Sequence, residues 1–556
     1  MNLLLVAVNA KYIHSNLALK YLSKLTENIC PAQIKEYSIN DNILSLERDI
    51  ILLKPDILAF SCYIWNIDFI LTICSNLKKA LPKTTIILGG PEVSFDSAQL
   101  IDKHKFIDYI VKGEGESSFP KLIEHLVNGT PLPDCGIACR KDGKAFETPN
   151  SPLPDFSIIP FPYDENNIKD CFGKIIYYET SRGCPYSCKY CLSGDKGKVR
   201  FKDIETIKKE LKFFSDNNIP LVKFVDRTFN ADKKRAAEIW EYISSLNTQT
   251  RFHMEITGEL LDDETINLLQ KVNPDNLQFE IGVQSTNPKT LSAINRVCKL
   301  EKLNNNINLL LEKTNIHIHL DLIAGLPYEN FESFKKSFND VISLSPHVLQ
   351  LGFLKLLKGS AMREESRNFG VVFRDNAPYE IISNNFISAE ELIFLKDIDF
   401  VFDKYYNSGS FSKTIEFLFG KYNDKFSIFA DIVEYFRKNA YINASLSKQK
   451  LYDVLYNCFS HFGKDFEEAL RYDLIFSLHL GKLPAWCNTD SDFTSSEAVY
   501  NFLKSEELKE QALPHFAGRP AKSIIKHVRF EKFSYGILMF DYANNIVYDV
   551  TKYIHQ

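Results

Sequence analysis

The chain has 556 residues and an ordinary globular composition. Hydrophobic residues make up 45% and charged residues 25%, and 66 Lys and Arg stand against 71 Asp and Glu, a formal net charge of −5. This composition excludes an intrinsically disordered or collagen-like chain. The nearly balanced charge argues against nucleic acid as the main partner, although it is compatible with a local basic groove. At roughly 100–200 residues per domain, the length indicates about three domains.

The twelve cysteines are the feature of the composition that most needs an explanation. The first eleven residues lack the basic segment and apolar run of a secretory signal. No window of the sequence offers the roughly 18–20 apolar residues of a membrane span. We therefore expect a cytoplasmic protein without a membrane partner, in which thiols stay reduced. In such a protein, clustered cysteines indicate metal ligands or catalysts before disulfides.

Residues 1–135 alternate short β-rich runs with amphipathic helical stretches. This rhythm predicts an α/β domain with an open, doubly wound parallel sheet of the Rossmann-like kind. Polar or glycine-bearing turns follow the strands, and in such sheets ligands bind beyond the carboxyl ends of the strands. We therefore expect a binding crevice at these turns. The expected strands are residues 3–8, 33–38, 57–61, 85–88 and 107–111, and the turns lie at 9–11, 61–63, 89–91 and 113–116.

Three further regions follow along the chain. Residues 136–172 contain five prolines and are expected to form an extended linker. From 173 to 360, six β-rich runs alternate with helical stretches, which predicts a partial (β/α)6 barrel of the TIM type with its functional face at the carboxyl ends of the strands. Residues 361–556 predict a mainly helical C-terminal domain that ends in a β-hairpin turning at 544–545. No motif in this last region indicates its role.

Three cysteines stand together directly after the first expected barrel strand. Cys184, Cys188 and Cys191 have the spacing C-x-x-x-C-x-x-C, and no fourth Cys or His, as a zinc site would need, follows within twenty residues. Three thiolates on one loop suit a 4Fe–4S cluster with one iron left open for an outside ligand. The alternatives are three unrelated thiols or a redox pair at 188 and 191. The position at the functional face of the barrel favours the cluster.

The triplet resembles the hallmark motif of the radical S-adenosylmethionine (SAM) superfamily. The resemblance implies that the three cysteines hold a catalytic 4Fe–4S cluster, and that an electron from it cleaves SAM to a 5′-deoxyadenosyl radical. Residues 252–256, 281–287, 293–296 and 321–327 resemble downstream motifs of this superfamily and follow in the right order, whereas 224–230 resembles the cobalamin-associated branch. The residues that the resemblance places at SAM are Tyr190, Glu255, Gln284, Ser285, Arg296, Asp321 and Gly325.

The N-terminal sheet resembles the cobalamin-binding domain of the same branch, and cobalamin is therefore implied as a further cofactor. The chain departs from many such domains because no D-x-H-x-x-G pattern follows the first strand. His14 does follow that strand, so either His14 ligates the lower face of the cobalt or that face has no histidine ligand. The residues that the resemblance assigns to cobalamin are Asn9, His14, Ser61, Tyr63, Gly89, Gly90, Pro91, Gly113 and Glu114.

The resemblance implies a cobalamin-dependent radical SAM enzyme, most often a methyltransferase, in which methylcobalamin delivers a methyl group to an unactivated carbon of a small-molecule or peptide substrate. A one-electron reductant such as flavodoxin or ferredoxin is the implied protein partner. Other members use the same parts for rearrangement or cyclisation. Methylthio transfer to tRNA would need a second cluster, for which Cys30, Cys62 and Cys74 are poorly placed. A cofactor-binding sensor or interaction protein is the non-enzymatic alternative.

Overall fold

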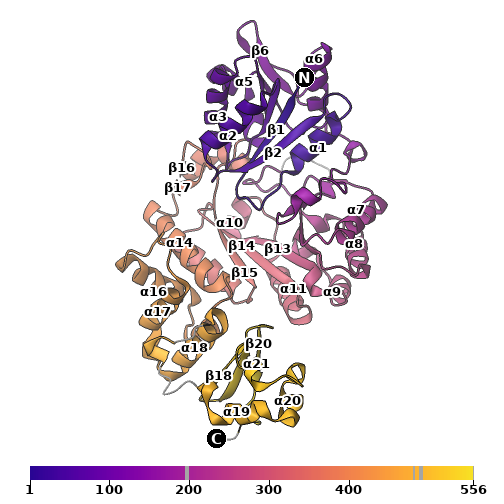
Figure 1. The fold of residues 1–556 in the computed structure, drawn as a ribbon. Coiled ribbons are helices and arrows are strands. Elements are labelled where there is room, and N and C mark those ends of the chain that lie inside the picture. The colour runs from indigo at the N-terminus through magenta and orange to yellow at the C-terminus, as the bar shows by residue number, and fades with distance from the viewer. Residues whose placement is uncertain (194–198, 480–482, 488–492, 555–556) are drawn as a thin grey trace. The chain divides into compact units, whose positions relative to one another are not determined.

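The computed structural model describes residues 1–193, 199–479, 483–487 and 493–554. The chain divides into two compact units, Met1–Leu392 and Ile393–Gln556 (Figure 1). The expected α/β fold with parallel sheets is confirmed. The first unit contains both an N-terminal sheet domain and a partial barrel. None of the helices in the described part of the chain is long and apolar enough to cross a membrane.

The N-terminal domain is built on a seven-stranded sheet in the order β2-β1-β3-β4-β5-β6-β7, in which β1 to β5 are parallel. Every residue of β1 is buried, as expected for a strand covered on both faces. Its alternate side chains enter two separate cores, one on each face of the sheet. The strands are β1 Leu3–Asn9, β2 Ala32–Ser38, β3 Ile57–Ser61, β4 Thr85–Gly89 and β5 Tyr109–Val111; the helices are α1 Leu17–Thr26, α2 Ile43–Leu53, α3 Ile67–Ala80, α4 Pro91–Ser94, α5 Ser97–Lys103 and α6 Ser118–Asn128.

The start of the expected linker differs from the prediction. Strands β6 (Ile137–Lys141) and β7 (Lys144–Glu147) form a hairpin that adds two antiparallel strands to the N-terminal sheet. The turn is Asp142-Gly143, and both residues have positive φ, 49° and 78°. An Asp-Gly pair is a strong hairpin signal because both positions tolerate this conformation. The proline-rich stretch after it carries the short helical turns Phe156–Ile158 and Lys169–Cys171.

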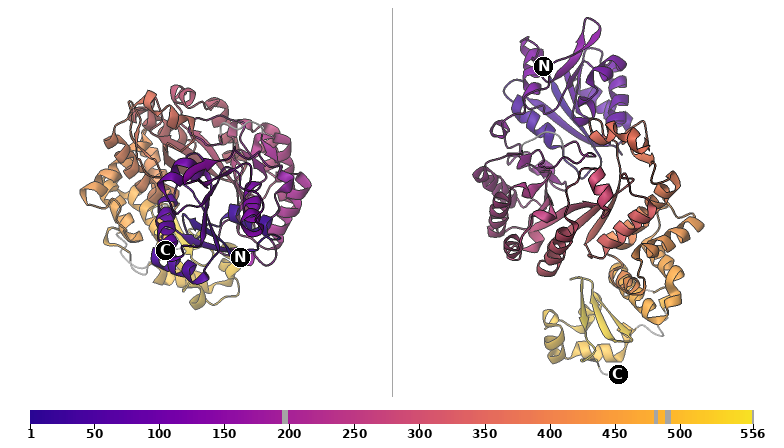
Figure 2. Two further views of the ribbon diagram at one scale, coloured as in Figure 1. Left: turned by 90° about the horizontal axis from the view of Figure 1, so that it is seen from above. Right: turned by 180° about the vertical axis from the view of Figure 1, so that it is seen from behind.

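The expected six-stranded barrel is present as a parallel sheet in the order β8-β11-β12-β13-β14-β15 (Figures 1 and 2). Asp or Asn caps the first turn of five of its helices by accepting a backbone N–H, as such residues favour. The strands are β8 Ile176–Tyr178, β11 Leu221–Phe224, β12 Arg251–Ile256, β13 Leu277–Gln284, β14 His317–Ala324 and β15 Val348–Phe353; the helices are α7 Ile204–Asp216, α8 Lys233–Ser245, α9 Asp263–Leu269, α10 Pro288–Ala293, α11 Leu300–Lys313 and α12 Phe331–Ile342.

Two details of the barrel position the functional site. Along β13, buried and half-buried residues alternate, and the half-buried ones are the polar or small residues Gln278, Glu280, Gly282 and Gln284. One face of the strand therefore packs on the helices while the other faces an unfilled interior. The sequence pattern predicts one helix over 288–312, but the structure interrupts it at 294–299, between α10 and α11. This interruption carries Arg296.

The region after the barrel combines short strands with helices. In the first unit, α13 (Ala361–Glu364) precedes the antiparallel pair β16 (Val372–Phe373) and β17 (Ile381–Ser383). The boundary between the units falls within α14. The second unit is mainly helical, as expected, and ends in three antiparallel strands rather than two, with residues 542–545 as the second turn. Its elements are α14 Ala389–Phe402, α15 Ser412–Lys421, α16 Lys425–Lys438, α17 Lys448–Phe459, α18 Lys464–Leu478, α19 Glu497–Lys504, α20 Glu506–Ala512, α21 Ala521–Ile524, β18 Val528–Phe533, β19 Gly536–Asp541 and β20 Ile546–Asp549.

Candidate functional site

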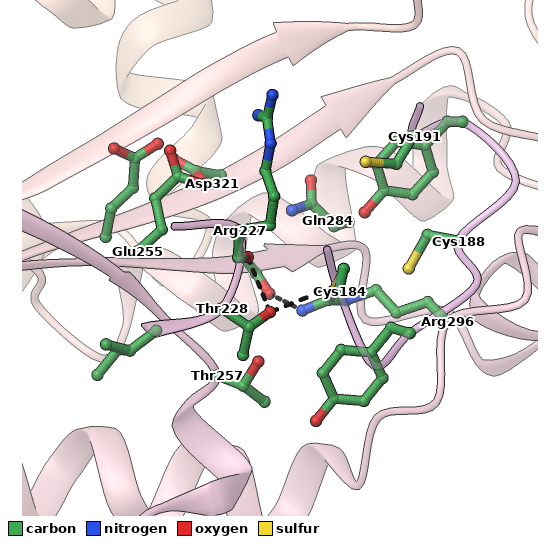
Figure 3. A pocket seen from close by; sticks show the side chains of 15 residues that line it. Cys184, Cys188, Cys191, Arg227, Thr228, Glu255, Thr257, Gln284, Arg296 and Asp321 are labelled. Carbon is green, nitrogen blue, oxygen red and sulfur yellow. Dashed lines mark hydrogen bonds between the residues drawn. The ribbon is translucent and has the colours of Figure 1, made fainter. Parts of the chain in front are cut away.

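The three clustered cysteines lie on one loop at the carboxyl end of the barrel. This loop, residues 183–193, follows the short strand β9 (Ser181–Arg182), which pairs antiparallel with β10 (Arg200–Phe201). Gly183 has a φ of 97°, which lets the chain turn immediately before Cys184. All three cysteines line a single cavity of about 190 Å³. We call this the cysteine cavity (Figure 3).

The interruption between α10 and α11 holds the cysteine loop in place. Lys189 donates its backbone N–H to the carbonyl of Ile294 at 3.0 Å. The Asn295 amide donates to Ser187, at 3.0 Å to its carbonyl and 2.7 Å to its hydroxyl. Asn295 has a φ of 53°, a conformation that Asn tolerates better than most residues. The break in the helix thus supplies the contacts that fix the loop.

One wall of the cysteine cavity is acidic. Glu255, Glu280 and Asp321 come from the adjacent strands β12, β13 and β14, and Figure 3 shows Glu255 and Asp321 across the cavity from Cys188 and Cys191. Burial, with the nearby carboxylates of Glu280 and Glu255, raises the pKa of Asp321 to about 8. Burial and Glu280 also raise the pKa of Glu255. This wall is therefore suited to a positively charged ligand.

Glu280 keeps its charge in this acidic wall. Its carboxylate oxygen Oε2 lies 2.9 Å from His253 Nε2 and 3.1 Å from Lys223 Nζ. Burial raises the pKa of Glu280, but the hydrogen bond from His253 and the charge of Lys223 outweigh burial and lower it to about 2. An ionised Glu280 beside Asp321 explains part of the raised pKa of Asp321.

Arg296 and Gln284 complete the wall on the other side. The Arg296 guanidinium donates to the carbonyl of Gly282, and its Nε is buried without a hydrogen-bond partner among the described residues. Gln284 has a φ of 72°, where the register between β13 and β14 shifts. Such conformations are costly for a residue other than glycine and concentrate at functional sites. The strained strand end and the unpartnered donor both face the cavity that the cysteines line.

The structure brings most of the predicted SAM residues together but leaves two aside. Tyr190, Glu255, Gln284, Arg296 and Asp321 line the cysteine cavity with the three cysteines. Ser285 does not: it is fully buried and donates to Glu329 at 2.6 Å. Gly325, with a φ of 87°, accepts a hydrogen bond from Asn384 through its carbonyl and packs near Ile381. The structure gives these two residues supporting contacts outside the cavity.

Several residues that line the cysteine cavity lie outside the sequence motifs. Glu280 is one of them, although it lies two residues before Gly282 and therefore on the same face of β13. Thr228 Oγ1 lies 3.5 Å from Cys184 Sγ. The strand period alone identifies Glu280, whereas only the fold brings Thr228 to the cysteine loop. The lining residues not assigned from the sequence are Tyr186, Arg227, Thr228, Ile256, Thr257, Glu280 and Gly282.

A second cavity, of about 530 Å³, lies between the N-terminal sheet and the barrel, both in the first unit. We call it the interdomain cavity. The end of β1 contributes Asn9, the turns after β3 and β5 contribute Tyr63 and Glu114, and the barrel contributes Tyr177 among other residues. Arg227 lines both this cavity and the cysteine cavity. The two cavities therefore adjoin at one side chain.

Of the predicted cobalamin residues, Asn9, His14, Tyr63 and Glu114 line the interdomain cavity. His14 Nδ1 lies 2.7 Å from the Tyr177 hydroxyl, and burial lowers the pKa of His14, so that its ring favours the neutral form. Tyr63 stacks on Trp65 with ring centroids 4.4 Å apart. The remaining predicted residues have other surroundings and do not line it: Ser61, Gly89, Gly90, Pro91 and Gly113.

The cysteines of the N-terminal domain do not form a second cluster of thiols. Cys62 and Cys74 lie in the core on one face of the sheet, and Cys30 lies in the core on the other face. Burial raises the pKa of the Cys62 and Cys74 thiols. Among the described residues, no three His, Cys, Asp or Glu side chains converge on a single metal ion. The thiolates of a 4Fe–4S cluster bind different irons, so the loop cysteines need not converge in this way.

Family comparisons divide the chain into three parts. Residues 3–123 match the B12 binding domain, residues 178–341 match the Radical SAM superfamily, and residues 367–554 match a family described as "Protein of unknown function (DUF4080)". TokK, a cobalamin-dependent radical SAM methyltransferase of Streptomyces tokunonensis, is 26% identical over 329 residues, which are 54% of this chain and 48% of TokK. The chain spans about half the length of the curated relatives it matches.

Two solved structures share the fold. The cobalamin-dependent S-adenosylmethionine radical enzyme OxsB, with aqua-cobalamin and S-adenosylmethionine bound, has a TM-score of 0.62 at 15% identity, over 87% of this chain and 82% of OxsB. The radical S-adenosylmethionine methyltransferase TsrM from Kitasatospora setae has a TM-score of 0.54 at 15% identity, over 68% of this chain and 79% of TsrM. At these identities, the likeness shows the fold.

A B12-binding domain followed by a radical SAM barrel defines a class of protein that combines two cofactor sites. The chain carries a B12-binding domain and a domain of the Radical SAM superfamily, and the region that follows them matches a family whose model states no function. The cofactors of these two domains are a 4Fe–4S cluster, SAM and cobalamin.

Proposed function

We propose that this protein is a cobalamin-dependent radical SAM methyltransferase that acts on an unactivated carbon of a small-molecule or peptide substrate. One observation carries the proposal: the cavity lined by three cysteines adjoins the interdomain cavity at Arg227. A radical generated in one cavity and a methyl donor held in the other need such a junction. The TokK and TsrM names support methyl transfer over the other reactions of the superfamily.

The residues of the cysteine cavity fit a cluster with bound SAM. Cys184, Cys188 and Cys191 supply three thiolates, which leaves one iron for an outside ligand. Two buried polar atoms lack partners among the described side chains, Arg296 Nε and Asp321 Oδ1. One can donate to a carboxylate and the other can accept from an ammonium, the two charged groups of an amino acid moiety. We infer that these atoms bind that moiety.

When bound, the cofactors supply hydrogen abstraction by a 5′-deoxyadenosyl radical and a methyl group on cobalt. The chain's own residues hold and orient the reacting groups. Arg296 and Asp321 would hold the two charged ends of the amino acid moiety, and Glu255 would supply a further carboxyl group in the same cavity. Asn295 holds the cysteine loop in place through its two hydrogen bonds to Ser187.

The interdomain cavity fits a corrin ring between the strand-end turns and the barrel. Its lining combines aromatic rings, Tyr63 and Trp65, with polar groups such as Asn9 and Glu114. Burial lowers the pKa of His14, and the Tyr177 hydroxyl occupies its Nδ1, so Nε2 would be the ring nitrogen available to ligate cobalt. We expect a one-electron protein reductant such as flavodoxin or ferredoxin, in the cytoplasm.

Anaerobic reconstitution tests the proposed function. Purified protein is loaded with iron, sulfide and cobalamin, and SAM cleavage to 5′-deoxyadenosine is measured with dithionite. We expect cluster and product in the wild type, and loss of both in C184A, C188A and C191A. The half-buried Cys135 lies outside both cavities, so C135A is the matched control and keeps both. An intact cluster in the three loop variants would overturn the site assignment.

A further inference from the structure

The short strands next to the cysteine loop each carry an arginine. Arg182, in β9, pairs directly with Arg200, in β10, as Cα partners. Two like charges opposite one another on an antiparallel pair are unfavourable unless anions lie between them. Arg182 stands two residues before Cys184. The charge balance here therefore bears on the position of the first cluster ligand.

The balancing anions come mainly from the N-terminal domain. Glu114 places Oε2 2.8 Å from Arg182 Nη1 and bonds Arg200 through Oε1. Glu116 Oε1 lies 2.5 Å from Arg182 Nη2. Within the barrel, Glu179 accepts from Arg182 Nε at 3.0 and 3.1 Å. We call these five residues the Arg182 clamp.

The Arg182 clamp is largely shielded from solvent. The side chains of Arg182, Glu116 and Glu179 are only 14%, 9% and 9% exposed. The Arg182 guanidinium also lies over the rings of Tyr21 and Phe156, 5.9 and 5.5 Å from their centroids. Because charge pairs are screened least where water is excluded, these contacts fix geometry more strongly than surface ion pairs do.

The clamp lies in the wall of the interdomain cavity, to which Arg182, Glu114, Glu116 and Glu179 all contribute. Both carboxylate oxygens of Glu114, a residue expected at cobalamin, are engaged by arginines. The side chain therefore connects the two domains. The same ion pairs therefore line the interdomain cavity and hold the strand that leads into the cysteine loop.

We propose that the Arg182 clamp is a positioning device by which the turn after β5 sets the place of the cysteine loop relative to the interdomain cavity. The inference rests on the proposed function, because it assumes a cluster on that loop. Glu114 and Glu116 hold the loop through Arg182, and Arg200 fixes the chain beyond it. The N-terminal domain thereby controls the geometry of a metal site to which it contributes no ligand.

The test compares R182K, R182Q and E114Q with the matched control E36Q. Glu36 also joins the N-terminal sheet to the barrel, through Lys174 at 2.7 Å with similar burial, but it does not contact the cysteine loop. Each protein is reconstituted anaerobically. The readouts are iron content, the electron paramagnetic resonance spectrum of the reduced cluster with and without SAM, cobalamin retention and melting temperature.

We expect R182Q and E114Q to change the spectrum of the reduced cluster and to reduce 5′-deoxyadenosine formation by about tenfold or more, because small displacements of reacting groups have effects of this size. R182K should recover part of the wild-type spectrum, since lysine keeps the positive charge but lacks the planar guanidinium that can donate to several carboxylates at once. E36Q should match the wild type in both readouts, whatever its melting temperature.

Wild-type spectra in R182Q and E114Q, with melting temperatures lowered as in E36Q, would overturn the proposal and leave a merely structural ion-pair network. If Arg182 variants fail to take up iron, E114Q decides the matter, because glutamine preserves the shape of the side chain. Failure of the proposed function would give a different result: the wild type would hold its cluster but cleave no SAM. The spectra of the reduced cluster in the variants and the wild type could still be compared, and they would still test the clamp.

Discussion

Asp321 shows how the barrel prepares a single residue for a ligand. Its Oδ1 is buried and has no hydrogen-bond partner in the described structure, and burial with two acidic neighbours raises its pKa to about 8. The protonated carboxyl is therefore the stable form of Asp321 below about pH 8. A cationic ligand should therefore bind more tightly once Asp321 has lost its proton.

This coupling predicts a pH-dependent effect of D321N on SAM affinity. Below pH 7, wild-type Asp321 is mostly protonated and resembles Asn, so the two proteins should bind SAM almost equally. As the pH rises through about 8, Asp321 ionises and the ratio of the D321N Kd to the wild-type Kd should rise to about 10, the size of one charge-assisted contact. Equilibrium dialysis with cluster-loaded protein measures this ratio, in which the titration of SAM itself cancels. A ratio independent of pH would contradict the assignment.

Glu329 predicts a pH-dependent stability at the neighbouring strand ends. Burial raises its pKa to about 7 against the hydrogen bonds from Ser285 and Ser337. A raised pKa means that its contribution to stability is complete below the unfolded value near 4.3 and is lost as the pH rises through about 7. Between pH 5 and pH 8, the free energy of unfolding of the wild type should therefore fall by about 1–3 kcal/mol more than that of E329Q, which has no carboxyl group to ionise at this position. Melting curves of both proteins at the two pH values check this, and parallel shifts would contradict it.

The break between α10 and α11 is the element that most affects the cysteine loop. Residues 294–299 form no helix, yet they hold the loop through Ile294 and Asn295 and present Arg296 to the cavity. A continuous helix over 288–312 would satisfy its own backbone groups and leave the loop without these partners. The non-helical segment 294–299 therefore supplies loop contacts and a cavity side chain that a continuous helix would not supply.

N295A should weaken cluster retention. The substitution removes two hydrogen bonds to Ser187 and places Ala at a φ of 53°, a conformation that costs about 1–2 kcal/mol. Iron release to a chelator should become several-fold faster. Asn218 has a φ of 51° in the turn after α7, away from the loop, so N218A controls for backbone strain alone. Equal iron release from both variants would show that the Ser187 contacts are unimportant.

The elements that could be predicted from the sequence are those with a clear period. Two patterns identify most strands: the continuous apolar runs of β1 and β3, which are buried on both faces of the sheet, and the alternation along barrel strands such as β13 and β14, which have one buried face. Asp142-Gly143 carried a hairpin signal that the prolines beyond it obscured. The break at 294–299 could not be predicted, because it depends on contacts with the distant cysteine loop.

The predicted site divides along similar lines. Residues at strand ends, such as Glu255 and Asp321, reached the cavity because strand direction and period fix their place. Ser285 follows the strained Gln284 and turns away to Glu329. Glu114 was assigned to a cofactor from its turn, but its ion pairs with Arg182 and Arg200 arise only when two domains meet. No period within either domain predicts them.

At the scale of the whole first unit, the N-terminal domain and the barrel are joined at both edges of the barrel sheet. The Arg182 clamp lies beside β8, the first strand. Beyond β15, the last strand in the sheet order, Lys358 pairs with Glu92 at 3.1 Å and Asp96 at 2.9 Å. Two separated attachment points resist rotation of one domain over the other. These ion pairs therefore help to fix the two walls of the interdomain cavity relative to each other.

Arg227 predicts a coupled loss at the junction of the two cavities. R227Q should lower the affinity for both SAM and cobalamin by about tenfold, because the guanidinium lines both cavities and a charge-assisted contact is worth about this much. T257V is the control, since Thr257 lines the cysteine cavity alone. It should affect SAM binding without affecting cobalamin. Dialysis of each cofactor separately measures both constants, and an effect of R227Q on only one of them would contradict a shared wall.

The β6–β7 hairpin has a practical consequence for dissecting the molecule. The B12-binding match ends at residue 123, whereas the sheet continues through Glu147. A fragment cut after α6 would leave the Tyr109–Val111 strand as a bare edge with unpaired N–H and C=O groups, which invites association with other chains. A fragment that extends through Thr148 keeps β6 and β7, so that the Tyr109–Val111 strand remains paired. Domain boundaries for expression should therefore follow hydrogen bonding rather than family limits.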